Sequence, residues 1–231
     1  MSQSTTTDCA LIVMCKRPQP GVGKQRVAQT HGTAVAYMLA KRLLECALED
    51  LSSWSGPRVI AVANSSDAQW ASRQLDDAII VEQGNGNLGE RIQKVSEEVT
   101  ETTERQLFIG IDAPTLNNDD YAMAADALFA HDVVLADAED GGVVLMGSCS
   151  GWPELQGLPW STERLGQSLL DACFATGRSV LKTLPHADVD FANQFDALIS
   201  TLADDPRASR RALVDWLQQI NRHSAIENAH A

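Results

Sequence analysis

Acidic side chains follow three strand-like segments of the chain, and this arrangement is the strongest indication of a functional site in the sequence. The three groups are Asp112 after residues 106–111, Glu139 and Asp140 after residues 132–136, and Asp188 and Asp190 after residues 179–184. Ligands of α/β sheets bind beyond the carboxyl ends of the strands, so we expect the three groups to face one another there. Two carboxylates ~4 Å apart repel by about 4 kcal/mol at an effective dielectric of ~20. A divalent cation with oxygen ligands removes that cost, so the spacing predicts a site for Mg²⁺ or Mn²⁺.

A basic loop follows the first strand-like segment and is a candidate phosphate site. Residues 16–26 (KRPQPGVGKQR) hold four cations, two glycines and two prolines, and a helical pattern begins within the segment. Glycines let backbone amides approach a ligand, and the start of a helix favours an anion. We therefore expect Lys16, Lys24 and Arg26 to bind phosphate oxygens. The lysines would act as point charges, and the Arg26 guanidinium would donate two parallel hydrogen bonds. The alternative is a solvated basic loop, and neither a Walker sequence nor a dinucleotide fingerprint is present.

Three further segments carry polar or glycine residues that could contact a substrate. The candidates are Asn87 and Gly89 in NGNLGER, Gly141 and Gly142 after the second acidic group, and Trp160, Ser161 and Thr162. Simpler roles are open for all of them, because Asn and Ser are common helix caps and Glu-Asp-Gly-Gly can form a tight turn. Asp112 could likewise be a turn residue, and residues 188–190 a solvated loop. No Gly-x-Ser-x-Gly sequence is present, so a serine hydrolase is not indicated.

Strand and helix patterns alternate along the whole chain, which predicts a three-layer α/β sandwich with a mostly parallel sheet. The predicted strands are residues 9–15, 58–63, 78–82, 106–111, 133–136, 142–147 and 180–184. The predicted helices are residues 26–51, 66–75, 88–102, 118–130, 161–176, 195–202 and 207–221. The turn before residues 142–147 is short, so we expect that strand to be antiparallel. One domain over residues 1–231 is expected, with a core at about 8–203, a C-terminal helix at about 207–222, and frayed segments at 1–7 and 222–231.

Composition limits the binding partners and the cellular compartment that we expect for the protein. The net charge of −13 disfavours nucleic-acid polymers and anionic membranes, because phosphate contacts need a basic surface. No apolar run approaches the roughly 20 residues of a membrane span. The five cysteines include no Cys-x-x-Cys pair, so we expect buried thiols in a reducing cytoplasm. The sequence does not determine the oligomeric state.

The quoted motifs, in order, resemble the bacterial DUF2064 family, which is described as nucleotide-diphospho-sugar transferase-like. The matching segments are LIVMCKRPQPGVGKQRVA, NLGERI, FIGIDAPTL, DVVLADAEDGGVVLMG, LPWSTE and LPHADVD, which span about residues 9–200. The resemblance implies the glycosyltransferase-A fold, shared with guanylyltransferases of molybdenum-cofactor and phospholactate metabolism. The positions that match the family motifs are Lys24, Arg26, Asp112, Glu139, Asp140, Gly141, Gly142, Trp160, Ser161, Thr162, Asp188 and Asp190. Gln25, Ala113, Val143 and Phe191 depart from the family pattern.

The motifs and the resemblance together predict a metal-dependent transferase that uses a nucleotide-diphospho-sugar and a small-molecule acceptor. We expect Asp112 and Asp190 to hold the metal, with Asp188 as a further ligand candidate. Asp112 and Asp140 are the candidate catalytic residues, with Asp140 acting as a base or supporting the metal site. Two alternatives stay open: a nucleotidylyltransferase that releases pyrophosphate from an NTP, and a nucleotide-binding module without turnover.

Overall fold

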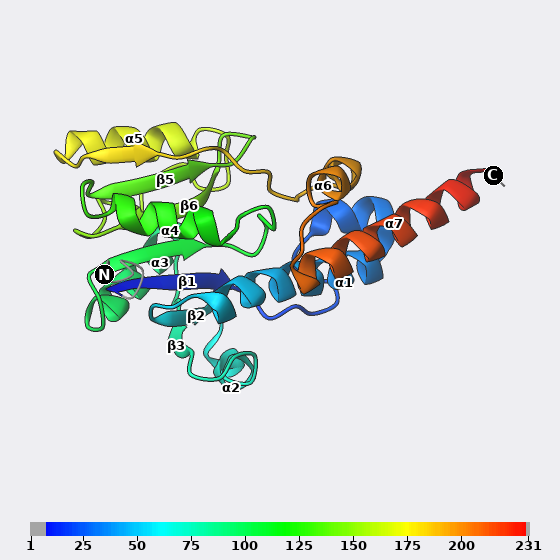
Figure 1. The fold of residues 1–231 in the computed structure, drawn as a ribbon, viewed down its shortest axis with the longest axis horizontal. Coiled ribbons are helices and arrows are strands. Elements are labelled where there is room, and N and C mark those ends of the chain that lie inside the picture. Colours follow the sequence, from blue (N-terminus) through cyan, green and yellow to red (C-terminus); the bar gives the residue numbers. More distant parts are fainter. Residues whose placement is uncertain (1–7, 230–231) are drawn as a thin grey trace.

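A seven-stranded mixed sheet forms the centre of the computed structural model, which describes residues 8–229 (Figure 1). The strands are β1 (Cys9–Cys15), β2 (Arg58–Val62), β3 (Ile79–Glu82), β4 (Arg105–Ile109), β5 (Val133–Asp137), β6 (Val143–Ser148) and β7 (Val180–Lys182), in the spatial order β3-β2-β1-β4-β6-β5-β7. Only β6 among these strands is antiparallel to its neighbours, β4 and β5. The predicted mostly parallel sheet with one antiparallel strand is therefore confirmed.

The order of the strands changes direction at β1, and we call this point the switch in strand order. The chain runs from β1 outward to β2 and β3, and then returns to place β4 on the other side of β1. From the carboxyl ends of these two strands, the connection after β1 therefore leads toward the β3 edge of the sheet, and the connection after β4 leads toward the β7 edge. A crevice is expected at such a point in an open α/β sheet.

The helices cover both faces of the sheet. They are α1 (Gln25–Ser53), α2 (Ala68–Ala71), α3 (Leu88–Thr100), α4 (Asn118–Ala127), α5 (Leu165–Ala175), α6 (Phe195–Thr201) and α7 (Ala208–Ala229), with short 3₁₀ turns at Ser65–Asp67 and Ala192–Gln194. Most predicted bounds agree to within a few residues, but three helix predictions were wrong. α2 covers only Ala68–Ala71 of the predicted 66–75, α5 begins at Leu165 instead of 161, and α7 continues to Ala229 instead of ending at 221. The expectation for residues 1–7 lies outside the described residues.

Alternate side chains of β1 enter two separate cores, which shows why the sheet needs a layer on each face. Leu11 and Val13 pack in a cluster with side chains of α1 and α4. Ala10 and Ile12 point the other way, into a cluster with side chains of α3 and α5. This period of two, with both sets buried, is typical of a central strand covered on both faces. The predicted three layers are thus confirmed.

A third core lies away from the sheet, where α6 and α7 pack against α1 (Figure 1). It includes Leu39 and Leu43 of α1 and Leu213 and Leu217 of α7, all of which are buried. Val189, between two residues of the last acidic group, is buried in the same core. The C-terminal helices therefore fix a segment that carries candidate site residues. Among the described helices, none has the length and apolar character that crossing a bilayer requires.

Candidate functional site

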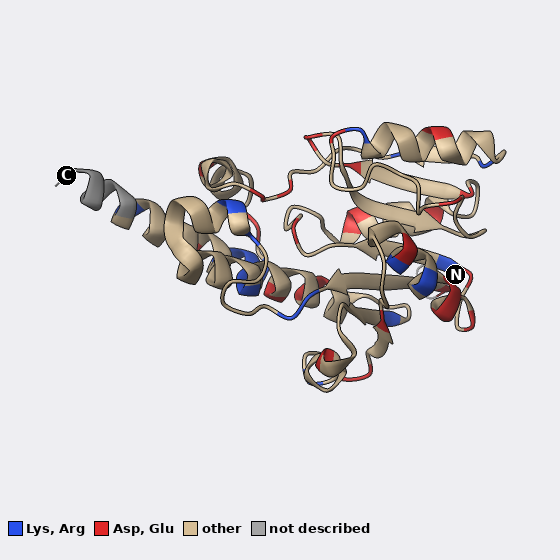
Figure 2. Ribbon diagram, turned by 180° about the vertical axis from the view of Figure 1, so that it is seen from behind, with Lys and Arg blue, Asp and Glu red and all other residues tan. Residues whose placement is uncertain are grey.

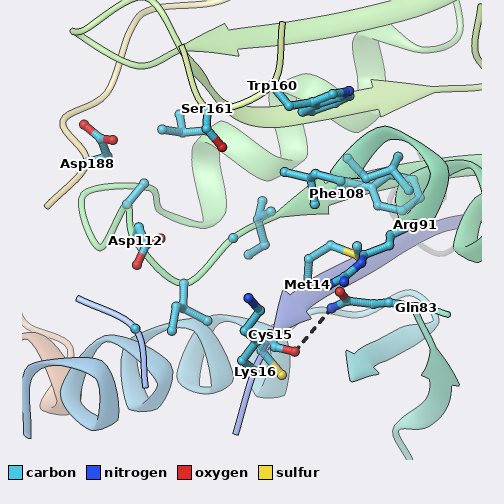
Figure 3. A pocket seen from close by; sticks show the side chains of 18 of the residues that line it. Met14, Cys15, Lys16, Gln83, Arg91, Phe108, Asp112, Trp160, Ser161 and Asp188 are labelled. Atoms are coloured by element: carbon cyan, nitrogen blue, oxygen red, sulfur yellow. Dashed lines mark hydrogen bonds between the residues drawn. The ribbon is translucent and has the colours of Figure 1, made fainter. Parts of the chain in front are cut away.

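A cleft of about 650 Å³ opens at the carboxyl ends of β1 and β4, at the switch in strand order (Figure 3). Its walls come from the loops after β1, β3 and β4, from β6, from the segment before α5, and from the segment before α6. Figure 2 shows basic residues at the start of the β1–α1 loop and acidic residues in the loops across from it. The predicted site residues that line the cleft are Lys16, Lys24, Asp112, Trp160, Ser161, Asp188 and Asp190.

Lys24 joins the two carboxylates that were expected to hold a metal. Its Nζ lies 2.6 Å from Asp112 Oδ1 and 3.2 Å from Asp190 Oδ1, and it donates to the carbonyl oxygen of Val189 at 2.5 Å. The Lys24 side chain is only 7% exposed, whereas those of Asp112 and Asp190 are 47% and 36% exposed. The sequence had assigned Lys24 to phosphate and the two carboxylates to metal, but these groups are direct partners. The ammonium offsets the repulsion between the carboxylates.

The backbone around Lys24 explains how its side chain reaches across the cleft. Lys24 occupies the cap position of α1 with φ 48° and ψ 38°, in the left-handed region, and Gly21 and Gly23 before it also have positive φ. Non-glycine residues adopt this region uncommonly, so the conformation is held by surrounding contacts. The two ion pairs of Lys24 are contacts of that kind.

Arg26 and Lys16 are the other predicted phosphate ligands. Arg26 Nη1 lies 2.8 Å from Asp190 Oδ2, and its guanidinium lies 4.7 Å from the centre of the Phe191 ring. Arg26 is half exposed and lies outside the cleft lining. Lys16 lines the cleft, and Figure 3 shows its ammonium pointing into it. Lys16 and Lys24 therefore lie at the cleft, with Arg26 beside it.

Asp188 is the half-buried carboxyl of the site. Burial raises its pKa, and the nearby charges of Asp140 and Asp190 raise it further. Asp140 itself lies outside the cleft lining, and its Oδ1 accepts a hydrogen bond of 2.9 Å from the amide of Gly142. This is the tight turn that the sequence allowed as an alternative. Asp188 therefore lines the cleft, and Asp140 is close enough for its charge to raise the Asp188 pKa.

The donor set suits a hard cation that takes further ligands from a substrate. Among the side chains that the structure describes, those of residues 8–223, no three His, Cys, Asp or Glu are grouped closely enough to hold a metal by themselves. Mg²⁺ is usually bound by one or two carboxylates together with waters and substrate phosphates. Asp112 and Asp190 supply two carboxylates that converge on one cation, the Lys24 ammonium. The two carboxylates therefore fit a hard cation that would take its other ligands from water or a phosphate.

Several predicted binding residues instead shape the walls. Asn87 caps α3: its Oδ1 accepts from the Glu90 amide at 3.1 Å, and its Nδ2 donates to the carbonyl of Gln156 at 2.8 Å. A Cβ on Gly89 would lie 2.5 Å from Trp160 Nε1, so this glycine lets α3 approach the Trp160 segment. Thr162 Oγ1 donates to the carbonyl of Pro159 at 2.7 Å. Substrate contacts of these residues stay predictions.

Gly141, the first residue of the Gly-Gly pair, and Ser161 both have a positive φ. Gly141 has φ +92°, and a Cβ there would lie 2.2 Å from the carbonyl oxygen of Glu163. Ser161 has φ 62°, which breaks the helical path, and α5 begins only after Arg164. The alternative in which Ser161 caps this helix is therefore wrong. Ser161 instead lines the cleft.

Apart from Trp160, the sequence prediction missed the far end of the cleft. Met14, Phe108 and Trp160 make one apolar wall there, with Gln83 and Arg91 beside them (Figure 3). Buried Gln83 donates through Nε2 to the carbonyls of Cys15 and Ala61, at 3.2 and 2.8 Å, and thereby ties the ends of β1 and β2 together. Gln83 directly follows β3, so the rule that located the acidic groups would have found it had polar amides been included.

The chain belongs to the family described as "Uncharacterized protein conserved in bacteria (DUF2064)", which matches residues 47–162, just over half of the chain. This confirms the family predicted from the motifs. No curated protein matches the chain in sequence.

Solved structures share the fold. A protein from Desulfovibrio desulfuricans G20, provisionally described as a nucleotide-diphospho-sugar transferase, superposes with a TM-score of 0.85 at 22% identity over 94% of this chain and 98% of its own. A cytidylyltransferase from Leptospira borgpetersenii serovar Hardjo-bovis gives a TM-score of 0.51 at 12% identity, over 95% and 96% of the two chains. Rv0371c from Mycobacterium tuberculosis H37Rv gives 0.50 at 17% identity, over 83% and 96%. The predicted nucleotide-diphospho-sugar transferase fold is confirmed.

Proposed function

We propose that the protein is a metal-dependent transferase that takes a nucleotide-diphospho-sugar and transfers the sugar to a small-molecule acceptor. The observation that carries the proposal is the convergence of Lys24, Asp112 and Asp190 at the cleft, at the switch in strand order. Cations and carboxylates placed together can bind a diphosphate and its counter-ion at one point. The fold supports the same class, because it is shared with a cytidylyltransferase and with the protein from Desulfovibrio desulfuricans.

The charged groups divide by their position around the cleft. Lys16 and Lys24, with Arg26 beside them, bind the phosphates and offset the charge that develops on the leaving diphosphate. Asp112 and Asp190 would hold Mg²⁺ or Mn²⁺, and the metal would supply further positive charge at the leaving group. With a metal on the two carboxylates, Lys24 would be available to pair with a phosphate oxygen instead. The apolar wall with Trp160 provides a surface on which a nucleotide base can stack.

The acceptor side is the acidic side of the cleft. Asp188 lines the cleft there, and Asp140 lies outside the lining but close enough to affect the pKa of Asp188. Either carboxylate can accept a proton from an acceptor hydroxyl. Asp140 is the base expected from the sequence, and Asp188 is the alternative favoured by its position at the cleft. Asp140→Asn and Asp188→Asn, assayed in parallel, separate the two: the larger loss of kcat identifies the base.

Nucleotidylyl transfer is the second candidate function. It is favoured by the single carboxylate after β4, because Asp112 stands alone and is not part of a central Asp-x-Asp pair. In that reaction an acceptor phosphate attacks an NTP and pyrophosphate leaves. A binding module without turnover is the third candidate, and the departures at Gln25, Ala113 and Val143 are compatible with it.

Product analysis distinguishes these functions. A thermal-shift screen of NTPs and of UDP-, GDP- and ADP-sugars, with and without Mn²⁺, first identifies the ligand, because a ligand of the native state raises its stability. The purified protein is then incubated with that ligand and a panel of acceptors. Release of a nucleoside diphosphate supports sugar transfer, and release of pyrophosphate supports nucleotidylyl transfer. Tight binding with no product and no metal dependence would favour the binding module.

Consistent with the charge and the cysteines, we propose a cytoplasmic location and no nucleic-acid polymer as partner.

A further inference from the structure

A buried ionic cluster lies beneath the loop that carries Asp112. Arg210 of α7 is 1% exposed, and its Nη2 donates to Asp50 Oδ2 of α1 at 2.6 Å. Arg207 Nη1 donates to the other oxygen of Asp50 at 2.8 Å, and the Tyr121 hydroxyl of α4 donates to Asp50 Oδ2 at 2.8 Å. Three helices thus meet at one carboxylate that is 2% exposed.

The same two arginines hold the backbone of the β4–α4 loop. Arg210 Nε donates to the carbonyl of Pro114 at 3.1 Å, and Arg207 Nη1 donates to the carbonyl of Leu116 at 2.8 Å. These carbonyls lie two and four residues after Asp112. Another bond joins this loop to the last acidic group, because the amide of Val189 donates to the carbonyl of Asp112 at 2.9 Å.

The chemical nature of this cluster is informative. Burial of charges is costly, and well-packed apolar residues often give equal or greater stability than a buried ion pair. A planar guanidinium offers several donors in fixed directions, which apolar side chains cannot do. Here those donors fix carbonyls of a surface loop that reaches the cleft. The cluster therefore specifies the conformation of the loop beyond any contribution to stability.

We infer that Arg207 and Arg210 are positioning residues that hold Asp112 at the distance and orientation from Asp190 that a divalent cation requires. The C-terminal helix α7 then helps to set the geometry of the site, although none of its described side chains lines the cleft. This inference rests on the proposed function for the cation, but the positioning itself can be measured without a metal.

The test compares Arg210→Met with Leu169→Ala. Leu169 is fully buried in α5, in the core on the other face of the sheet, so its truncation destabilises the protein without touching the loop. Arg207→Met is the second variant, because it leaves the Arg210–Asp50 pair in place and should fold if Arg210→Met does not. Hydrogen exchange of the Val189 amide, which bonds to Asp112, reports the loop directly.

Either arginine variant should speed exchange at Val189 at least tenfold relative to the amides of β1, whereas Leu169→Ala should leave that ratio unchanged. The free Mn²⁺ remaining in a titration, measured by electron paramagnetic resonance, should show at least tenfold weaker binding for the arginine variants only. An unchanged exchange ratio in both arginine variants would overturn the positioning role. Selective exchange at Val189 with no Mn²⁺ binding by the parent protein would keep the positioning role and remove the metal from the proposed function.

Discussion

Lys24→Met should make the protein bind Mn²⁺ more tightly and nucleotides more weakly. In the structure, the Lys24 ammonium contacts Asp112 at 2.6 Å and Asp190 at 3.2 Å. A metal that takes both carboxylates must replace these contacts. Methionine has a similar length but no charge, so it removes the ammonium from both carboxylates while keeping most of the packing, and Asp190 keeps its ion pair with Arg26.

The size of the effect follows from these two contacts. Hydrogen bonds to charged groups contribute about 1.5–3 kcal/mol each. The carboxylates are 47% and 36% exposed, and the displaced ammonium regains hydration, so the lower end applies. A net gain of about 1.5 kcal/mol corresponds to roughly tenfold tighter Mn²⁺ binding. The loss of one phosphate contact should weaken nucleotide binding by about 1.5–3 kcal/mol.

The assay is a calorimetric titration with Mn²⁺ alone, followed by one with the nucleotide found in the ligand screen. Lys16→Met is the matched control, because Lys16 lines the same cleft and its replacement changes the net charge equally. That control should lose nucleotide affinity without a tenfold gain for Mn²⁺. If Lys24→Met binds Mn²⁺ no more tightly than the parent protein, the metal does not compete with Lys24, and the exchange proposed here is refuted.

Two further predictions concern stability. Gly141→Ala should lower the free energy of unfolding by about 1–3 kcal/mol more than Gly177→Ala, because a Cβ at residue 141 would overpack against Glu163. Both glycines have positive φ, so both variants carry backbone strain, but the space around Gly177 is open. Equal losses in urea unfolding would argue against the close approach at Gly141. Asp188→Asn should stabilise the protein near pH 7, since a carboxyl with a raised pKa in the folded state makes stability fall as the pH rises from its unfolded pKa of about 3.9 through the folded value. Thermal melts should show this advantage vanish below about pH 3.9, and an advantage that persists there would contradict the pKa shift.

Pattern was enough to locate the edge of the sheet where the site lies. Asp112 could be placed because carboxyl ends of parallel strands meet, and that reasoning needs only strand direction and order of residues. The contact between Lys24 and Asp190 could not, because 166 residues separate them and the contact depends on a left-handed backbone at Lys24. Ser161 shows the same limit, since a positive φ at a serine has no signal in a sequence.

The third core and the ionic cluster were also beyond the sequence patterns. The α7 pattern predicts a helix, but it does not say which carbonyls Arg210 will meet. A buried arginine cannot be distinguished from a solvated one by its spacing, because arginine is usually exposed. Arg91 shows the same limit, because its place in the first turn of α3 does not reveal that it lines the cleft.

Metal-dependent binding of a nucleotide-sugar is the most direct test of the account. The measurement is a calorimetric titration of UDP-, GDP- and ADP-sugars into the parent protein and into Asp112→Asn, each with and without Mn²⁺. We predict that at least one nucleotide-sugar binds the parent protein at least tenfold more tightly with Mn²⁺, and that Asp112→Asn, folded by circular dichroism, loses this dependence. Equal Mn²⁺ dependence in the two proteins would contradict the role of Asp112 and with it the proposed site.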